Sequence, residues 1–339
     1  IKSLVIDHHE MTRPFPKANV IINPKKDNGY IEYDYLCATT LTYFFLDILV
    51  KKIKCKLNLK KYLIYVLLAT VCDVMPLRKL NRLIATTALK EFNFSENTVF
   101  NKIYELSKKK NKININDLGF LIGPILNSGG RLGKSNYAVE LLSSENIQTI
   151  KQRSADLITL NNKRKEIEHA TLKEINFDEI EKKNEKIIFY YKANINEGLL
   201  GIISARLKDY FDKPTIVITN SKNLLKGSAR SVYNYNIGKA VRRALDQNII
   251  LHGGGHNMAA GFSLKKSNLS TFDEYIQKDF TKHSISLDTG FKYDSQISSS
   301  IFNKNFFNDI KKIEPFGNEN PLPIFLFKDL KVIKSIIIQ

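Results

Sequence analysis

Apolar residues in the first part of the chain follow helical spacing after one short, strand-like run. The run LVI at residues 4–6 is uninterrupted, which is typical of a buried strand. The apolar patterns that follow predict helices over about 35–52, 59–72, 79–92 and 98–109. A strand followed by packed helices indicates an α/β domain with a parallel sheet, and we expect this chain to carry the later part of it.

The stretch from residue 146 to residue 183 contains neither Pro nor Gly. It includes the charged run NNKRKEIEHATLKEI, in which no helix-breaking residue occurs. The sequence therefore predicts one long, solvent-facing helix here, which would suit a connection between two lobes.

Strands and helices alternate again beyond this predicted helix, and a glycine-rich segment, LHGGGHNMAAGFSL, follows at 251–264. This alternation is typical of a second, smaller α/β domain. The expected elements are 186–191 (strand), 197–211 (helix), 214–219 (strand), 226–231 (strand or loop) and 236–245 (helix).

The pattern changes once more from about residue 286. Short apolar runs flank the turn segment EPFGNENPLP at 314–323, and the chain stops inside IFLFKDLKVIKSIIIQ, an unfinished β pattern. Because the chain also opens with Ile inside a strand, we expect a polypeptide cut at both ends. The predicted parts are a first domain over 1–145, the connecting helix over 146–183, a second domain over 184–285 and a β domain over 286–339.

The composition is that of a globular protein, with 43% hydrophobic and 25% charged residues among 339. The apolar segment at 62–72 is shorter than the roughly 20 residues that a membrane helix needs. Cys37, Cys55 and Cys72 are widely spaced and odd in number, so they indicate neither a disulfide framework nor a zinc site. A reducing, cytoplasmic setting is expected.

The formal net charge of +18 favours a polyanionic partner such as nucleic acid. Codon pressure in an AT-rich genome is the alternative explanation, because Lys outnumbers Arg by 42 to 10 and Asn and Ile are abundant. In so Lys-rich a chain, an Arg that persists is expected where its planar, bidentate fork matters.

The strand at 4–6 ends in Asp7, His8 and His9, three side chains that bind metals or carry protons. Ligands of open α/β sheets bind at the carboxyl ends of strands. Imidazole together with carboxylate suits a borderline divalent ion such as Mn²⁺. The alternative is that one His packs or caps a helix while the Asp takes a turn.

Two further segments of the first domain carry candidate chemistry. The apolar helix at 59–72 is followed by Asp73, a carboxylate that needs a cation if it is buried and is otherwise a solvated helix end. The segment IGPILNSGGRLG at 122–133 predicts a flexible loop, in which Asn127 and Arg131 could hold a phosphate. A simple turn between helices is the alternative for this loop.

The second domain carries two candidate anion sites. KGSARS at 226–231 places Ser228 and Arg230 around backbone that an anion could approach. GGGH at 253–256 has the pattern of a phosphate loop that leads into a helix N-terminus, although glycine-rich turns are common.

Together and in this order, these motifs resemble the DHH phosphoesterase superfamily and, within it, the single-strand-specific exonucleases. The resemblance runs over essentially the whole chain. The DHH motif corresponds to residues 7–9, and the next acidic motif corresponds to Asp73 in TVCDVMPL. The family's arginine loop, usually Asn-Ala-Ala-Gly-Arg, is NSGGR here, with Asn127 and Arg131 retained.

The resemblance extends into the second domain and beyond. The DHH-associated domain of the family has a Ser-Gly-Arg-Ser pattern, which is SARS at 228–231 here, and a Gly-Gly-His signature, which falls on 254–256. EPFGNENPLPIF resembles the entry to the family's oligonucleotide-binding barrel. The family's earlier acidic motifs would precede residue 1, so the resemblance implies that this polypeptide alone binds metal poorly and hydrolyses little.

The resemblance also implies roles for these residues. His8 and Asp73 would be metal ligands, and Asp7 would orient its neighbour. His9 would lie near the scissile phosphate. The implied cofactor is Mn²⁺ or Mg²⁺, with two ions in the complete protein. The implied substrate-binding residues are Asn127, Arg131, Ser228, Arg230, Gly254, Gly255 and His256.

By resemblance, the expected function is hydrolysis of single-stranded DNA from the 5′ end, releasing nucleotides, in DNA repair and recombination. The expected partners are single-stranded DNA, a single-strand-binding protein and a helicase, for a cytoplasmic monomer without membrane contact. The alternatives are a DHH-family oligoribonuclease or nucleotide phosphatase, and a DHH-like replication factor that binds DNA without catalysis.

Overall fold

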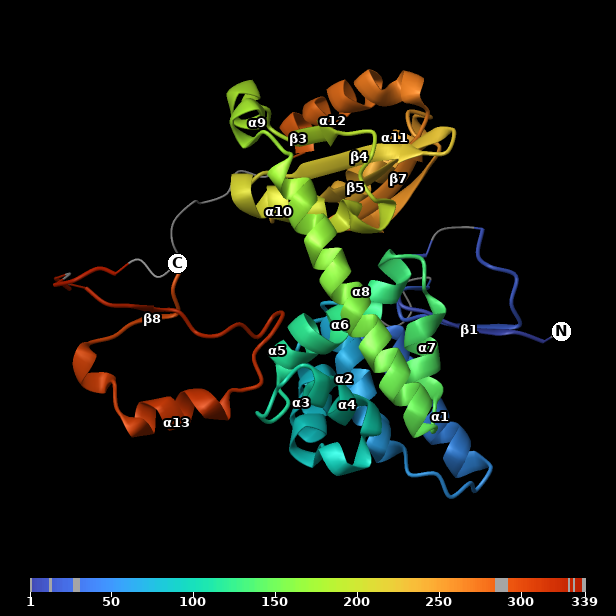
Figure 1. Cartoon of the computed structure of the whole chain (residues 1–339), viewed down its shortest axis with the longest axis vertical. Helices are drawn as coiled ribbons and strands as arrows, with labels where there is room; N and C mark the ends of the chain where they lie inside the picture. Colours follow the sequence, from blue (N-terminus) through green and yellow to red (C-terminus); the bar gives the residue numbers. More distant parts are fainter. Residues whose placement is uncertain are drawn as a thin grey trace. The chain divides into compact units, whose positions relative to one another are not determined.

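The computed structural model forms two compact units, which are described separately (Figure 1). The first comprises Ile1–Asn101, Lys108–Gly123 and Thr289–Gln339, and the second comprises Lys102–Ser107 and Pro124–Asp288. The predicted boundary at 285–286 and the last residues of the final β pattern, 337–339, lie outside the described residues. The structure describes residues 2–11, 14–26, 31–283, 292–328, 330–331 and 333–336.

The first unit begins with a small parallel sheet and continues with helices. β1 (Leu4–Ile6) pairs with β2 (Val20–Ile22), with Leu4 opposite Val20. The helices expected over 35–52, 59–72, 79–92 and 98–109 are all confirmed. The helical elements are η2 (Ile31–Tyr33), α1 (Ala38–Lys52), η3 (Leu59–Tyr62), α2 (Leu63–Cys72), α3 (Lys79–Glu91), η4 (Phe94–Glu96), α4 (Thr98–Leu106), α5 (Ile115–Asp117) and η5 (Leu118–Ile122).

The C-terminal segment of the chain completes the first unit. It contains β8 (Ser295–Gln296), η8 (Ser299–Ile301), α13 (Lys304–Lys312) and β9 (Phe325–Leu326), and β8 pairs with β9 in parallel. Between α13 and β9, residues 313–320 contact the residues that join α2 to α3. A segment distant in the sequence therefore supports the end of α2.

The second unit is built on a five-stranded sheet in the order β3-β4-β5-β7-β6. β3 and β4 are parallel, and the other neighbours are antiparallel. The strands are β3 (Ile188–Tyr191), β4 (Thr215–Ser221), β5 (Leu224–Arg230), β6 (His252–His256) and β7 (Ala259–Leu264). The helical elements are α6 (Gly123–Arg131), α7 (Asn136–Ser143), α8 (Ile147–Lys173), α9 (Phe177–Lys183), η6 (Glu197–Leu199), α10 (Leu200–Phe211), α11 (Ile237–Asp246), η7 (Lys266–Asn268) and α12 (Leu269–His283).

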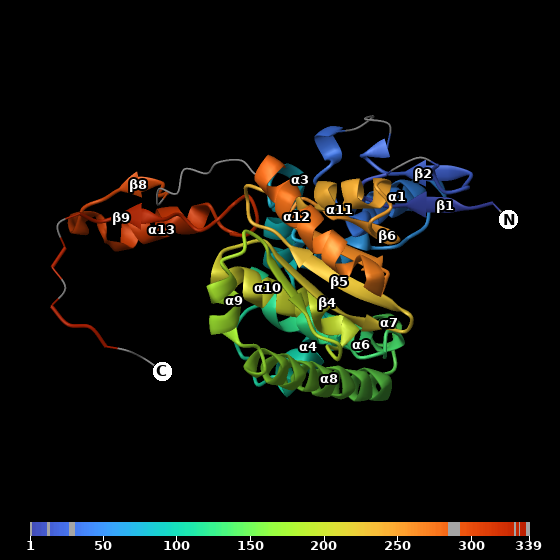
Figure 2. The same cartoon turned by 90° about the horizontal axis from the view of Figure 1, so that it is seen from above.

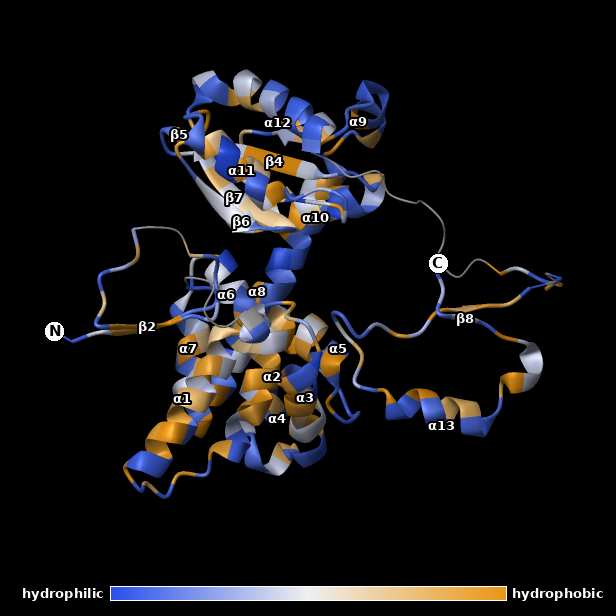
Figure 3. Ribbon diagram, turned by 180° about the vertical axis from the view of Figure 1, so that it is seen from behind, coloured by the Kyte–Doolittle hydropathy of each residue, from blue (hydrophilic) through white to orange (hydrophobic). Residues whose placement is uncertain are grey.

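Helices cover both faces of this sheet, with α10 on one side and α12 on the other (Figure 2). The interior strand β4 explains why, because Ile216 and Ile218 face one core while Val217 faces the other, and all three side chains are fully buried. Figure 3 shows β4 coloured as hydrophobic along most of its length. A strand that is apolar on both faces requires a layer on each side. Across the described residues, no helix has the length and hydropathy needed to cross a bilayer.

Asparagine side chains cap many of the helices in both units. In each case the side-chain oxygen accepts a hydrogen bond from a backbone N–H of the first turn, which satisfies a donor that would otherwise have no partner. Among the described residues, the caps of this kind are Asn58, Asn93, Asn97, Asn114, Asn146, Asn176, Asn196, Asn236 and Asn303.

The prediction of a single solvent-facing helix over 146–183 was wrong in two respects. The helix α8 ends at Lys173, and Asn176 caps a separate helix, α9, so a cap rather than Pro or Gly makes the break. α8 also buries one face, whose residues recur at helical spacing. The buried residues of α8 are Ile150, Ser154, Leu157, Asn161, Arg164 and Glu168.

Candidate functional site

The DHH motif directly follows β1 at the carboxyl end of the small parallel sheet. The backbone N–H of Asp7 donates to the carbonyl of Ile22, which ties the motif to β2 at 3.0 Å. One potential ligand atom from each of Asp7, His8 and His9 lies within 4.8 Å of the others. These adjacent side chains converge at the point where the strand ends.

The three side chains of the motif have different surroundings. His8 is 12% exposed, and its Nδ1 accepts a hydrogen bond from the N–H of Ala38, the first residue of α1, at 3.2 Å. His9 is 60% exposed and its Nδ1 lies 2.7 Å from an oxygen of Asp7. Asp7 therefore contacts His9, two positions away, rather than its sequence neighbour His8.

The electrostatics of the motif favour a neutral His8 and an ionised Asp7. Burial lowers the pKa of His8 and the nearby ring of His9 lowers it further, while Asp73 and Asp7 oppose this change. Burial acts to raise the pKa of Asp7, but hydrogen bonds from His9 and from the backbone of His8 outweigh it, and the pKa is lowered. Neutral imidazole and carboxylate are the protonation states that bind divalent metals.

Asp73 faces His8, with 3.8 Å between a carboxylate oxygen and Nε2 of the ring. It is the residue at the C-terminal end of α2, and its side chain is 48% exposed. The next residue, Val74, has a positive φ of 54°. The structure thus brings Asp73 to the DHH motif, which lies far earlier in the chain.

The expectation of a flexible loop over 122–133 was wrong, because residues 123–131 form α6. The buried hydroxyl of Ser128 donates to the carbonyls of Ile125 and Leu157. Gly129 is tightly packed, since a Cβ there would lie 2.5 Å from the carbonyl oxygen of Lys134. Gly129 therefore serves close packing, and Arg131 is presented by a helix end with Asn127 exposed on the same helix.

Arg131 and Arg230 are both held in place by backbone carbonyls of the second unit. Nη1 of Arg131 donates to Gly198 at 2.9 Å, and Nη1 of Arg230 donates to Ala229 at 2.9 Å and to the hydroxyl of Ser228 at 3.3 Å. Gly201 leaves room for the side chain of Arg230, because a Cβ at position 201 would lie 2.7 Å from Nη2 of Arg230.

The two guanidinium groups form a positively charged site. Burial lowers the pKa of Arg230, and repulsion from Arg131 lowers it further. Burial and repulsion from Arg164 lower the pKa of Arg131, while Glu168 opposes this change. Half-buried cations that repel each other favour an anion, and the arginine fork matches a phosphate.

Sequence reasoning missed the ion pairs behind this site. Glu168 is 8% exposed and accepts from Arg164 and Arg206, at 2.8 Å in each case. The signal was present, since Arg164 and Glu168 are four residues apart on a predicted helix. The burial of the Arg164–Glu168 pair could not be predicted, because the whole helix was expected to face solvent.

The interpretation of GGGH as a loop that leads into a helix was also wrong. These residues belong to β6, which forms a hairpin with β7. Gly255 is required by the approach of the partner strand, since a Cβ there would lie 2.3 Å from the carbonyl oxygen of Ala259. Gly254 has open space above it, and the end of β6 at His256 is exposed. The helix beside this strand is α11, whose Gly238 contacts the backbone of His256.

A buried carboxylate fixes α11 against α12. Asp279 is 4% exposed and accepts two hydrogen bonds from Arg243, at 2.9 and 2.7 Å, and one from the hydroxyl of Tyr235 at 2.7 Å. Tyr235 in turn accepts a hydrogen bond, through its carbonyl, from the hydroxyl of Ser231. This network therefore supports the turn that follows the SARS segment, and no pattern in the sequence indicated it.

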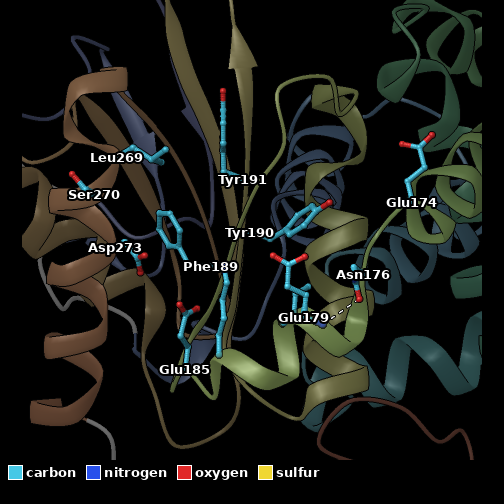
Figure 4. A pocket seen from close by; sticks show the side chains of 12 residues that line it. Glu174, Asn176, Glu179, Glu185, Phe189, Tyr190, Tyr191, Leu269, Ser270 and Asp273 are labelled. Carbon is cyan, nitrogen blue, oxygen red and sulfur yellow. Dashed lines mark hydrogen bonds between the residues drawn. The ribbon is translucent and has the colours of Figure 1, made fainter.

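A separate pocket of about 480 Å³ lies along β3, at the edge of the sheet opposite β6 (Figure 4). Phe189 points toward Leu269 of α12, and Tyr190 points to the other side, toward Glu179 of α9. None of the residues predicted to bind metal or substrate is among those that line this pocket. It is therefore distinct from both candidate sites.

Comparison with known domain families identifies two regions of the chain. Residues 184–282 match the DHHA1 domain, and residues 293–339 match the RecJ OB domain. The first match contains the SARS and Gly-Gly-His segments, and the second contains the EPFGNENPLP segment.

Curated relatives are similar over nearly the whole chain. The chain is 29% identical to the single-stranded-DNA-specific exonuclease RecJ of Haemophilus influenzae and covers 60% of that protein, with 96% of the chain aligned. It is 28% identical to the protein of the same name from Bacillus subtilis, of which it covers 41%, again with 96% aligned. The chain thus spans about half the length of these relatives.

Solved structures share the fold. The structure of RecJ from Thermus thermophilus in complex with Mn²⁺ superposes with a TM-score of 0.82 at 21% identity, covering 96% of this chain and 48% of that one. A structure of exonuclease RecJ bound to manganese gives a TM-score of 0.64 at 22% identity, covering 83% of this chain and 69% of that one. These similarities confirm the predicted α/β architecture. The chain carries a DHHA1 domain and a RecJ OB domain, and its predicted resemblance to the RecJ-type members of the DHH superfamily is confirmed.

Proposed function

We propose that this chain belongs to a metal-dependent exonuclease that hydrolyses single-stranded DNA from the 5′ end and releases nucleotides, in DNA repair and recombination. The observation that carries the proposal is the approach of Asp73 to His8 within the DHH motif, at 3.8 Å. The names of the curated relatives support the same activity.

The residues of the DHH motif suit a divalent ion. His8 and Asp73 would hold the metal, Asp7 would support it, and His9 would lie near the scissile phosphate. His8 accepts a hydrogen bond at Nδ1, so its ring proton lies on Nε2, facing Asp73. Binding an ion through Nε2 would move this proton and release the contact with Ala38. Two bound ions, Mn²⁺ or Mg²⁺, would lower the pKa of a bound water and neutralise charge on the phosphate.

The second unit would bind the DNA strand. Arg131 and Arg230 would grip phosphates with Ser228, because their guanidinium groups are already held in place by backbone carbonyls. Gly254, whose open space allows close approach, would present the domain to the terminal nucleotide together with Gly255 and His256.

The match to the RecJ OB domain favours long single-stranded DNA over a dinucleotide as the substrate. The single-strand preference would be steric and electrostatic, without base readout. A single-strand-binding protein and a helicase are proposed as further partners of a cytoplasmic monomer, and the three free cysteines suit that setting.

The test uses the protein encoded by the full open reading frame that contains this chain. It measures the Mn²⁺-dependent release of nucleotides from 5′-phosphorylated single-stranded DNA. We expect degradation of the single strand, little of the duplex, and a rate about 10- to 100-fold lower in the variant Asp7→Ala. Asp47→Ala is the control, because Asp47 is a partly exposed carboxylate on α1 that pairs with Lys51. Unchanged activity in Asp7→Ala, or preference for a dinucleotide, would overturn the proposal.

A further inference from the structure

The C-terminus of α2 has a Val residue, Val74, at a position where Gly is usual. The N–H of Val74 donates to the carbonyl of Val71 at 3.1 Å, and the N–H of Met75 donates to that of Thr70 at 2.9 Å. These two bonds define a Schellman motif, in which the residue at the position of Val74 adopts a left-handed conformation and is usually Gly. Val74, with φ of 54°, therefore takes a conformation that β-branched residues rarely adopt.

The side chain of Val74 does not explain this conformation. It is 66% exposed, so little apolar burial holds the residue in place. Strained residues persist where the surrounding structure determines their geometry, and they concentrate at functional sites. Val74 directly follows Asp73, the candidate metal ligand, so the left-handed turn at Val74 continues directly from the backbone that carries this carboxylate.

The residues that hold Val74 come from the far end of the chain. Nδ2 of Asn318 donates to the carbonyl of Val74 at 2.6 Å, and the N–H of Leu77 donates to the carbonyl of Asn318 at 2.7 Å. Gly317 lies against the buried Leu77, and a Cβ at Gly317 would be 2.5 Å from Cδ1 of Leu77. Asn318 thus bridges both ends of the turn 74–77.

Further contacts fix the segment that carries Asn318. Arg78 pairs with Glu319 at 3.3 Å, and Arg82 donates to the carbonyl of Ile313 at 2.8 Å. The side chain of Asn320 donates to the carbonyl of Pro315 at 2.8 Å. The segment is therefore anchored to α3 and to itself, independently of the bonds made by Asn318.

We propose that Asn318 is a positioning residue for Asp73, which acts by holding Val74 in its left-handed conformation. Asn318 lies in the region that matches the RecJ OB domain, so this bond links that region to the candidate metal centre. A change in the position of the segment 313–320, such as one caused by a bound DNA strand, is transmitted to the Asp73 carboxylate. The inference rests on the proposed function for its consequence at the metal.

The test combines Asn318→Ala with Val74→Gly in the protein encoded by the full open reading frame, because Gly adopts positive φ without strain. Mn²⁺ affinity is measured by calorimetry, and hydrogen exchange of the Met75 amide reports on the turn itself. We expect Asn318→Ala to weaken Mn²⁺ binding about tenfold, because loss of a residue that holds a metal ligand in place has an effect of this size. We also expect faster hydrogen exchange at the Met75 amide. The double variant is expected to return to within about twofold of Val74→Gly in both measurements. Asn305→Ala, at an exposed position of α13, is the control and should change neither.

The results separate the positioning role of Asn318 from the proposed metal centre. Unchanged exchange and unchanged Mn²⁺ affinity in a folded Asn318→Ala chain would overturn the positioning role, as would a failure of Val74→Gly to suppress the loss. If the wild-type protein encoded by the full open reading frame binds no Mn²⁺, that result would count against the proposed metal centre. In that case exchange at Met75 would still decide whether Asn318 holds the turn.

Discussion

The two candidate sites differ in how firmly the fold holds them. The DHH motif follows a strand of three residues in a two-stranded sheet, and the side chains of His9 and Asp73 are 60% and 48% exposed. Arg131 and Arg230 are anchored to backbone carbonyls in a unit with a five-stranded sheet and two buried cores. The same unit contains buried ion pairs around Glu168 and Asp279.

This difference reflects the chemistry that each site would perform. A bound metal ion orders its own ligands, because it contributes folding free energy when it binds. A phosphate contributes less, so the groups that grip it must be oriented beforehand. Substitutions in the second unit should therefore reduce stability, whereas those in the DHH motif should reduce ligand binding.

The largest expected effect is that of Asp279→Asn. This change leaves Arg243 without its partner and weakens the bond from Tyr235, so we expect the free energy of unfolding to fall by about 3–5 kcal/mol. Urea or thermal unfolding measures it. Asp246→Asn, at the exposed end of α11, is the matched control and should change stability by no more than about 0.5 kcal/mol. Equal effects would show that the network does not stabilise the unit.

The same carboxylate predicts a pH dependence. Burial acts to raise the pKa of Asp279, but the bonds from Arg243 and Tyr235 outweigh it and lower the pKa below its usual value. The stabilisation is therefore present above pH of about 4 and is lost as the pH falls toward the lower, folded-state pKa, by about 1.4 kcal/mol per unit of the difference. The stability gap between wild type and Asp279→Asn should narrow between about pH 5 and pH 3, and a constant gap would contradict this.

A smaller loss is expected from Gly198→Ala. The new Cβ would lie 2.2 Å from the carbonyl oxygen of Arg131, a backbone atom that cannot turn away. We expect destabilisation by about 1–3 kcal/mol and weaker binding of single-stranded DNA. Gly130→Ala, where no atom lies within 4 Å, should instead stabilise α6 by up to about 1 kcal/mol. Similar losses in both variants would refute this packing argument.

Asp7→Asn should sharpen the contrast between the sites. The carboxylate is partly exposed and its bond to His9 is a local one, so we expect a stability change of at most about 1 kcal/mol. Mn²⁺ affinity, measured by calorimetry, should fall about tenfold or more. A large loss of stability with unchanged Mn²⁺ affinity would reverse the assignment of this motif.

The smallest stability effect is expected from Gly254→Ala, within about 0.5 kcal/mol, since open space surrounds the new Cβ. Single-stranded DNA affinity, measured by fluorescence anisotropy, should nevertheless fall if the strand approaches this backbone. Unchanged affinity would remove Gly254 from the proposed DNA-binding surface.

Much of the fold could be predicted from the sequence because periodicity survives in long elements. α1, α2 and α3 were predicted to within a few residues, since apolar spacing and the stop signal at Pro76 are local properties. The approach of Asp73 to the DHH motif could be expected only from family resemblance.

The errors arose where distant backbone determines the role of a residue. Gly129 and Gly255 suggested loops, but each lacks a side chain because another segment packs against it. The hydrogen bond between Asn318 and Val74 joins residues 244 positions apart, and no local sequence pattern indicates it. Asp279 could not be told from the other acids of its helix until its partners were known.

The asparagine caps have a consequence for how such a chain can change over evolutionary time. A nucleotide bias toward A and T enriches a proteome in Asn, which is a poor residue for the interior of a helix. At the N-cap, the residue just before the first turn of a helix, Asn stabilises the helix as well as Ser or Asp does. A lineage under this bias can therefore replace other capping residues with Asn at almost no loss of stability, and nine helical elements of the described chain are capped in this way.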